Sequence, residues 1–318
     1  MIRTTRVTAS VLSLVVAPLL AATAAAHEGH DKVFVGYLYG SPKDVDFSLY
    51  THLCHAFLTA GPDGTLNPGR NVPNRDLTTE AHKAGVKVLI SLGGWGWDDQ
   101  FRAIVADPQA ESRYVEAVLK MVDEYDYDGV DVDWEYPDTE VEKPGFERLV
   151  RAFRTRLDAM GKAKGRPMLV TMAASSNPGT IDWLDTAFLI ETMDWVNVMT
   201  YDYAGDWTDY AGHNSPLFTS SKAGRRGGSI ERTMKYLLEK RGVPPEKLAV
   251  GLPLYGRGFA VSEPYASTKG APKRRMPNLD ARNIDKLLAE GWVRTWDDET
   301  KTPWLKSPDG STLVGYDD

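Results

Sequence analysis

One stretch near the middle of the chain constrains the fold more than any other. Residues 127–137 read Tyr-Asp-Gly-Val-Asp-Val-Asp-Trp-Glu-Tyr-Pro, which places acids at Asp131, Asp133 and Glu135. Successive side chains of a β-strand point to opposite faces, so the three carboxyl groups share one face and the apolar residues between them share the other. Like charges and desolvation both oppose ionisation of acids on a buried strand. Because perturbed protonation states are typical of active sites, we interpret the three acids as catalytic.

Two other interpretations of the acids are weaker. A calcium-binding loop has glycine at its sixth position and polar residues between its ligands. Here Tyr136 occupies the sixth position, and Val132 and Trp134 separate the acids. A solvated acidic face is disfavoured because these intervening residues are strongly apolar. We therefore expect neither a metal nor a cofactor at this site.

The acid stretch resembles a known family signature. Residues 128–137 are similar to the signature of the family 18 glycoside hydrolases, the chitinases, in which the last acid protonates the glycosidic oxygen. The resemblance implies this role for Glu135. Residues 91–95, 199–203 and 251–257 match the motifs of the family's third, sixth and seventh strands, and the resemblance extends from Val33 to about Tyr316.

The resemblance implies a retaining, substrate-assisted reaction. Asp133 lies on the same face as Glu135, too close to serve as an opposed nucleophile. The 2-acetamido oxygen of the sugar would instead attack the anomeric carbon and form an oxazolinium ion, which requires N-acetylglucosamine on the non-reducing side of the cleaved bond. Asp133 would hold the acetamido N–H and Tyr201 would donate its hydroxyl to the acetamido oxygen. Asp131 would share a proton or a hydrogen bond with Asp133.

The implied partner is chitin or an oligomer of N-acetylglucosamine. Sugar rings present apolar faces that stack on aromatic side chains. The predicted binding residues lie at strand ends and comprise Tyr37, Phe57, Trp95, Trp97, Met199, Asp202, Trp207, Tyr255 and Arg257. Phe57 could equally be a packing residue, a core position for Trp95 is the weaker alternative, and Arg257 could form a salt bridge to an insertion. Trp195 is more simply a core residue.

Two alternative functions stay open at this point. One is a non-catalytic barrel that binds chitin or oligosaccharides, although non-catalytic relatives usually replace the acid. The other is an endo-β-N-acetylglucosaminidase that acts on N-linked glycans. The match at residues 255–257 and the insertion described below favour chitin, with endo or exo action undecided.

Short β-rich runs alternate with helical patterns, which predicts βα units and a parallel sheet. Asp107-Pro108 predicts the start of a helix that runs to about Glu124, and an apolar stripe from Phe146 to Leu157 predicts another that packs on the sheet. The pattern predicts a TIM-type (β/α)8 barrel, whose active site lies at the carboxyl ends of the strands. The predicted strands are residues 33–39, 52–58, 87–92, 127–135, 168–172, 194–199 and 248–253.

The C-terminal part does not continue this alternation. A helix at 284–290 and strands at 293–296 and 312–316 predict a small α+β insertion over residues 259–314. The catalytic barrel would then span 33–258, and residues 315–318 would return to it. No eighth strand is predicted, so we expect a barrel truncated before that strand and a chain that is a fragment of a longer protein.

The N-terminus has the features of a secretory signal peptide. Arg3 and Arg6 precede an apolar run that small residues follow, which predicts a signal peptide over 1–26 and a leader over 27–32. The run is too short to cross a bilayer, so we expect a secreted protein, extracellular or periplasmic, with no membrane partner. A net charge of −7 argues against nucleic acid as a partner, and we expect a monomer.

Overall fold

The computed structural model describes residues 32–43, 45–272 and 276–318. The predicted signal peptide, residues 1–26, lies outside these ranges, as does the predicted leader apart from Lys32. Within the described ranges, no helix combines the length and the apolar character needed to span a membrane.

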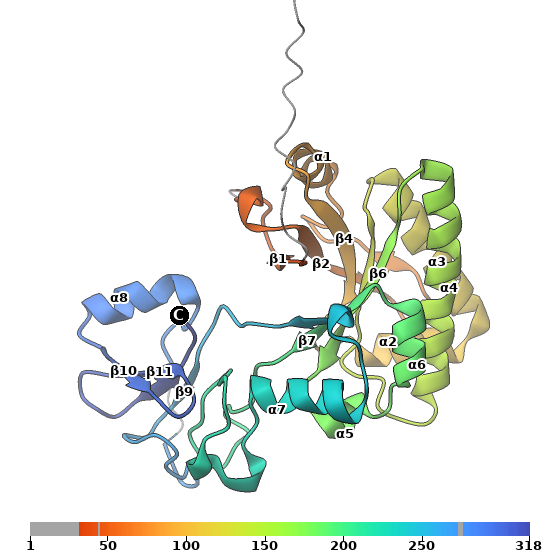
Figure 1. Ribbon diagram of the computed structural model, residues 1–318. Helices are drawn as coiled ribbons and strands as arrows, with labels where there is room; N and C mark the ends of the chain where they lie inside the picture. The colour runs from red at the N-terminus through yellow and green to blue at the C-terminus, as the bar shows by residue number, and fades with distance from the viewer. Residues whose placement is uncertain (1–31, 44, 273–275) are drawn as a thin grey trace, which may run out of the picture.

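Seven parallel strands form a curled sheet in the order β1-β2-β4-β5-β6-β7-β8 (Figure 1). They are β1 (Val35–Tyr39), β2 (His52–Ala60), β4 (Lys87–Gly93), β5 (Gly129–Asp133), β6 (Leu169–Ser175), β7 (Trp195–Met199) and β8 (Leu248–Val250). A short strand, β3 (Leu66–Asn67), pairs antiparallel with the end of β2. Each of the seven predicted strands is present, and their order in space follows their order in the chain. This is the architecture of a TIM-type barrel, which confirms the predicted fold class.

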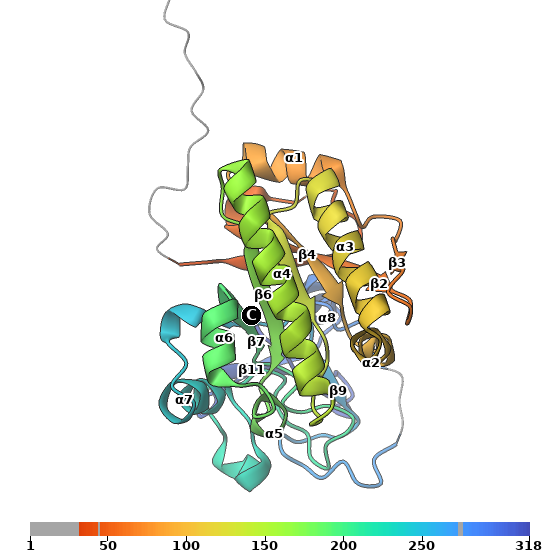
Figure 2. The ribbon, with the colours of Figure 1, turned by 90° about the vertical axis from the view of Figure 1, so that its right-hand side faces the viewer.

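Helices cover the outer face of the sheet, and Figure 2 shows α3 and α4 in front of it. The helices are α1 (Arg75–Lys83), α2 (Asp98–Ala106), α3 (Pro108–Glu124), α4 (Glu142–Lys164), α5 (Pro178–Ile181), α6 (Thr186–Thr192) and α7 (Ile230–Lys235). A π-helical turn (Tyr236–Lys240) extends α7, and 3-10 turns occupy Phe47–Leu49, Ser221–Arg226, Pro245–Lys247 and Ala281–Asn283. The Asp107 carboxylate accepts the backbone N–H of Gln109 and Pro108 opens α3, as predicted.

The two faces of β5 meet different surroundings. Val130 and Val132 are fully buried toward the helices. Trp134, just past the strand, stacks on Phe101 of α2 with 5.1 Å between ring centroids and meets Phe146 of α4 edge-on at 6.1 Å. The apolar face therefore packs under the helices, as predicted, and leaves the acids to the interior of the barrel.

Two aspartates fix the amino ends of neighbouring strands. Asp128 Oδ2 accepts the backbone N–H of Val88 at 2.8 Å, and Asp194 Oδ2 accepts that of Val170 at 2.7 Å. Each carboxylate satisfies a buried N–H where a strand begins. These contacts hold β4 to β5 and β6 to β7 in register, so the side chains at the opposite, carboxyl ends converge.

A second, antiparallel sheet has the order β10-β11-β12-β9. It contains β9 (Arg257–Phe259), β10 (Val293–Asp297), β11 (Thr302–Lys306) and β12 (Leu313–Gly315), and α8 (Ile284–Ala289) accompanies it. Figure 1 shows this unit in blue on the side of the barrel away from α3 and α4. The sheet begins at Arg257, two residues before the predicted boundary at 259, and still includes Gly315. The sequence predicted α8, β10 and β12 but neither β9 nor β11.

The loop that follows β7 joins the two sheets. Ala204 and Ala211 of this loop form a small core with residues of the second sheet: Phe259, Trp304 and Leu313. The ring of His213 lies over Trp304, with 3.9 Å between centroids. The loop thereby holds the start of β9 beside the carboxyl end of β7.

Candidate active site

The register of three strands brings polar side chains into one row. Ser91 of β4 pairs with Asp131 of β5, which pairs with Thr171 of β6. Two residues closer to the carboxyl ends of these strands, Gly93 of β4 pairs with Asp133 of β5. A Cβ atom on Gly93 would lie 2.6 Å from the carbonyl oxygen of Asp133, and its φ of +99° favours glycine. Glycine therefore lets β4 pass close to the acid strand.

Asp131 is fully buried, and each of its carboxylate oxygens accepts two hydrogen bonds. Oδ2 accepts from the hydroxyls of Tyr37 at 2.9 Å and Ser91 at 2.7 Å. Oδ1 accepts from the hydroxyl of Thr171 at 2.7 Å and the amide of Asn197 at 3.2 Å. Burial raises the pKa of Asp131, and the four donors oppose this rise because they stabilise the ionised form.

Asp133 lacks a comparable set of hydrogen-bond donors. It is 4% exposed, and its Oδ1 is buried without a hydrogen-bond partner. Burial raises the pKa of Asp133 well above its ordinary value, and the charges of Glu135 and Asp131 add to the rise. In the described structure no hydrogen bond joins Asp131 to Asp133, contrary to the expectation, because the four donors already occupy the oxygens of Asp131. Of the two acids, Asp133 holds a proton more strongly.

Glu135 lies just past the end of β5 and is half-buried. Burial raises its pKa to about 7, the charges of Asp98 and Asp202 also raise it, and a hydrogen bond with Tyr136 opposes the rise. A carboxyl group with such a pKa carries a proton near neutral pH. Glu135 is therefore equipped to act as a general acid and afterwards as a general base.

Tyr201 approaches the acids from the end of β7, two residues after the half-buried Met199. Its ring meets Tyr255 edge-on, with 6.1 Å between centroids. Burial raises the pKa of Tyr201, and the hydroxyl of Tyr255 and the carboxyl groups of Asp133 and Glu135 contribute further. The hydroxyl therefore stays protonated and can donate a hydrogen bond.

Arg257, at the start of β9, closes the site from the second sheet. Its Nε donates to Asp202 Oδ1 at 2.7 Å, and its guanidinium carbon lies 5.0 Å from the ring centroids of both Trp207 and Tyr255. The salt bridge of Arg257 is therefore formed to Asp202 in the loop after β7, and not to the insertion as the sequence analysis considered. The arrangement brings Asp202, Trp207, Tyr255 and Arg257 together.

Comparison with known proteins decides the family. Residues 30–318 match the model of the glycosyl hydrolases family 18. The chain belongs to this family. Over 302 residues it is 28% identical to a probable endochitinase of Caenorhabditis elegans, with 87% of the chain and 48% of that protein covered. Over 313 residues it is 27% identical to chitinase 1 of Aphanocladium album, with 88% and 73% covered.

Solved structures agree with this assignment. A chitinase of Trichuris suis has a TM-score of 0.78 at 27% identity and covers 90% of this chain and 86% of that one. The Ostrinia furnacalis Group IV chitinase has a TM-score of 0.79 at 27% identity, with 91% and 86% covered. The fold and the family assignment of the chain therefore agree. The chain spans about half the length of the nematode relative and 37% of chitinase A1 of Niallia circulans.

Aromatic side chains surround the mouth of the barrel in this family 18 hydrolase. Trp95 is 79% exposed and Trp207 57%. Phe57 packs beside Gly94, where a Cβ atom would lie 2.9 Å from the ring. Tyr39, which the sequence analysis did not select, is 81% exposed and lies 6.1 Å from Phe57 between ring centroids. Its position two residues after Tyr37 on β1 was the available signal, because side chains two apart share a strand face.

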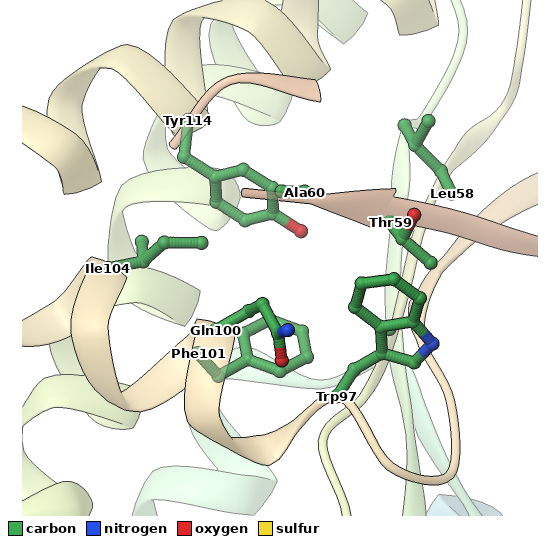
Figure 3. A pocket seen from close by; sticks show the side chains of 9 residues that line it. Leu58, Thr59, Ala60, Trp97, Gln100, Phe101, Ile104 and Tyr114 are labelled. Atoms are coloured by element: carbon green, nitrogen blue, oxygen red, sulfur yellow. The ribbon is translucent and has the colours of Figure 1, made fainter. Parts of the chain in front are cut away.

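Trp97 immediately precedes α2. It borders a small pocket between the end of β2 and helices α2 and α3 (Figure 3). The other lining residues are Leu58, Thr59, Ala60, Gly93, Gln100, Phe101, Ile104 and Tyr114. Most of these belong to the core under the helices. Gly93, which lines the same pocket, pairs with Asp133 of the acid row, and sugar binding by Trp97 stays a prediction.

Sequence reasoning missed three donors of the acid row: Ser91, Thr171 and Asn197. Ser91 was part of a matched motif, but only its neighbours were interpreted. The signal for all three was a small polar residue inside an otherwise apolar strand. Within the described ranges, no group of three or more His, Cys, Asp and Glu side chains is arranged to hold a metal ion.

Proposed function

We propose that this family 18 hydrolase cleaves β-1,4 linkages between N-acetylglucosamine units of chitin with retention, by substrate-assisted catalysis. The observation that carries the proposal is the graded acid row: burial raises the pKa of all three acids, but only at Asp131 do four hydrogen-bond donors oppose the rise, while the pKa of Asp133 is raised well above its ordinary value and that of Glu135 to about 7. The substrate is supported by relatives named as chitinases and by a solved family 18 chitinase from Cycas revoluta in complex with (GlcNAc)4, 26% identical to this chain.

In the first step Glu135 donates its proton to the glycosidic oxygen while the bond to the anomeric carbon breaks. Asp133 projects from the same strand face, so no carboxylate of the row opposes Glu135 across the sugar. The acetamido oxygen therefore bonds to the anomeric carbon, Asp133 accepts the acetamido N–H, and Tyr201 donates to the acetamido oxygen. The products are a cyclic oxazolinium ion and a leaving group with a free hydroxyl.

In the second step Glu135, now ionised, takes a proton from a water that attacks the anomeric carbon. The ring of the oxazolinium opens, the acetamido group is restored and Glu135 regains its proton. Two displacements at one carbon give net retention. Asp133, which accepts the N–H of the oxazolinium ring, stabilises the positive charge of the intermediate.

The sugar chain is held by the residues around the acids. Trp95 and Trp207 are exposed enough to stack on sugar rings, and Tyr37, Phe57 and Tyr255 add aromatic surface. Asp202, Arg257, Met199 and Trp97 complete the proposed binding set. The proposed units are a catalytic barrel and an α+β insertion that borders the cleft. The sequence places the ends of the insertion at 259 and 314, with a return to the barrel at 315–318, whereas the second sheet runs from Arg257 to Gly315.

We also propose that the protein is secreted, because residues 1–26 have the composition of a signal peptide. In this proposal the mature protein is a monomer that acts on extracellular or periplasmic chitin. Fusion of residues 1–32 to a reporter tests export directly, and retention of the reporter in the cytoplasm contradicts it.

Glu135→Gln tests the mechanism. We expect hydrolysis of chitin hexamer to fall about 10²–10⁴-fold, because general-acid catalysis contributes that much. Binding, followed by tryptophan fluorescence on addition of chitotetraose, should persist because glutamine preserves the side-chain shape. NMR of the first product formed by the native protein should show the β-anomer.

Three results separate the alternatives. Undiminished turnover by Glu135→Gln contradicts the role of this acid. Binding without turnover by the native protein favours the non-catalytic barrel, and cleavage of an N-linked glycan in preference to chitin favours the endo-β-N-acetylglucosaminidase. A substrate without the acetyl group at the cleaved unit should not be hydrolysed, because the nucleophile is then missing.

A further inference from the structure

The four donors around Asp131 are not equivalent. The hydroxyls of Tyr37, Ser91 and Thr171 can either donate or accept, because a hydroxyl proton rotates about its C–O bond. The nitrogen of the Asn197 amide can only donate. Its Nδ2 lies 3.2 Å from Asp131 Oδ1. If Asp131 Oδ1 carried a proton, that O–H and the amide N–H would both be donors facing each other. A hydroxyl could rotate and accept the proton's hydrogen bond, but the amide nitrogen cannot. The Asn197 amide therefore opposes protonation of Asp131 in a way that the hydroxyls do not.

Trp195 fixes which end of the amide faces the acid. Its indole Nε1 donates to Asn197 Oδ1 at 2.8 Å, and an indole N–H has no acceptor capacity. Turning the amide over would place its N–H2 against the indole N–H and its oxygen against the carboxylate of Asp131. Trp195 is 6% exposed and Asn197 7%, so water is largely excluded from competing for these groups.

The amide contacts a second member of the site. Nδ2 also donates to the Tyr37 hydroxyl at 3.1 Å, and that hydroxyl in turn donates to Asp131 Oδ2 at 2.9 Å. One chain of donors therefore runs from Trp195 through Asn197 and ends on both oxygens of Asp131. Chains of this kind strengthen each bond along them.

We propose that Trp195 and Asn197 form a positioning pair that keeps Asp131 ionised throughout the reaction, so that the exchangeable proton stays with Asp133 and Glu135. The inference deepens the proposed function and rests on it. Neither residue of the pair is assigned to the sugar or to the reacting atoms, and both act through Asp131.

The titratable groups that act on Asp131 support this assignment. They are Tyr37 on β1, Cys54 on β2 and Asp133 on β5 itself, while β4, β6 and β7 contribute uncharged donors. Burial and the charge of Asp131 raise the pKa of Tyr37 and of Cys54, so both groups are neutral. Within the described ranges, stabilisation of the anion thus comes from neutral donors, of which only the amide has a fixed direction.

Two variants and one control test the pair. Asn197→Leu removes the donor at nearly constant volume. Trp195→Phe leaves all four donors of Asp131 in place but frees the amide to turn. Trp304→Phe is the matched control, because Trp304 is 2% exposed, its indole nitrogen has no partner and it lies in the second sheet.

The first readout is the carboxyl 13C resonance of Asp131, assigned by its disappearance in Asp131→Asn and followed over pH. We expect the protonation midpoint of Asp131 to rise by about one pH unit in Asn197→Leu and about half a unit in Trp195→Phe, with Trp304→Phe unchanged. The second readout is the pH profile of kcat/KM on a fluorogenic aryl glycoside of di-N-acetylchitobiose. Its acid limb should move to higher pH in the same order, with kcat reduced more than KM is changed.

The proposal is overturned if Asp131 in Asn197→Leu titrates within about 0.2 pH unit of the native protein, or if Trp304→Phe shifts it as much as Trp195→Phe. If Asn197→Leu does not fold, Trp195→Phe carries the same test. The carboxyl resonance needs no turnover. If the Asp131 resonance shifts as expected in the variants but the native protein hydrolyses no chitin, only the proposed function is refuted. If the native protein hydrolyses chitin but the midpoint of Asp131 does not shift in the variants, only the positioning pair is refuted.

Discussion

Three chemically similar carboxyl groups share one strand face, but the groups that surround each of them give them different tendencies to hold a proton. Asp131 meets four donors, Asp133 meets none at its buried Oδ1, and Glu135 is half-buried beside other acids. Their protonation states therefore diverge although their side-chain chemistry is nearly the same. A site that needs both an anion and an acid near neutral pH is built in this way.

Besides burial, the negative charge of Asp98 raises the pKa of Glu135. Burial raises the pKa of Glu135 to about 7, and the negative charge of Asp98 adds to this rise. Asp98→Asn removes that charge, so ionised Glu135 is less disfavoured and its pKa falls. The alkaline limb of the kcat/KM profile should then move to lower pH by up to about one unit.

The neighbouring acid is the control for this prediction. Asp99 has a side chain that is 92% exposed and pairs with Arg102, and it is not among the groups that shift Glu135. Asp99→Asn should leave the alkaline limb in place. Equal shifts in the two variants, or a shift of the Asp98→Asn profile to higher pH, would contradict the assigned role of Asp98.

At the residue scale, the sequence identified the three acids but not the hydrogen-bond donors around Asp131. The spacing of two was enough to place Asp131, Asp133 and Glu135 on one face, because strand geometry is local. The donors Thr171 and Asn197 lie tens of residues away, and they reach Asp131 only through the register of neighbouring strands. A single sequence does not encode that register in any local pattern.

Among the secondary-structure elements, α3 shows how a local signal determines a boundary. Asp107 Oδ1 accepts the backbone N–H of Gln109 at 2.9 Å, which satisfies a donor that the helix itself leaves free. Asp107→Ala should lower the free energy of unfolding by about 1 kcal/mol, measured by urea denaturation. Asp107→Asn should recover most of this loss, since asparagine also caps helices, and equal losses in both variants would argue against capping.

The elements that sequence analysis missed have weak local signals. The strand β11 contains Pro303, and proline within a run usually argues against a strand. The strand β9 has three residues and includes Gly258, which offers no alternation to detect. β9 pairs with β12, which comes much later in the chain, and β11 pairs with β10 and β12. Their existence depends on tertiary contacts that propensity does not report.

At the scale of the whole molecule, the two ends of the barrel carry different groups of side chains. The carboxyl ends of the strands carry the acid row, and the amino ends carry ion pairs that tie strands to helices. The alternation of strands and helices in the sequence was enough to predict the barrel. The position of the second sheet was not predictable in this way, because it depends on contacts of the long loop after β7 with Phe259 and Trp304.

The pairing of His82 at the amino end makes stability depend on pH. This residue lies in the last turn of α1, and its Nε2 is 2.7 Å from Asp128 Oδ2. The hydrogen bond to Asp128 raises the pKa of His82, the charges of Asp128 and Asp126 add to the rise, and burial and Arg166 oppose it. The folded state therefore binds the His82 proton more tightly than the unfolded state does.

The sign of the effect follows from this difference. The stabilisation is fully present below the unfolded pKa of about 6.5 and is lost as pH rises through the higher, folded value. The free energy of unfolding should accordingly decline just above pH 6.5, and His82→Gln should remove that part of the slope. Lys83→Gln serves as the control, because Lys83 is an exposed neighbour whose ion pair is with Glu80. Urea denaturation at intervals between about pH 5.5 and 8.5 measures all three proteins. An unchanged slope in His82→Gln would mean that another group links protons to folding here.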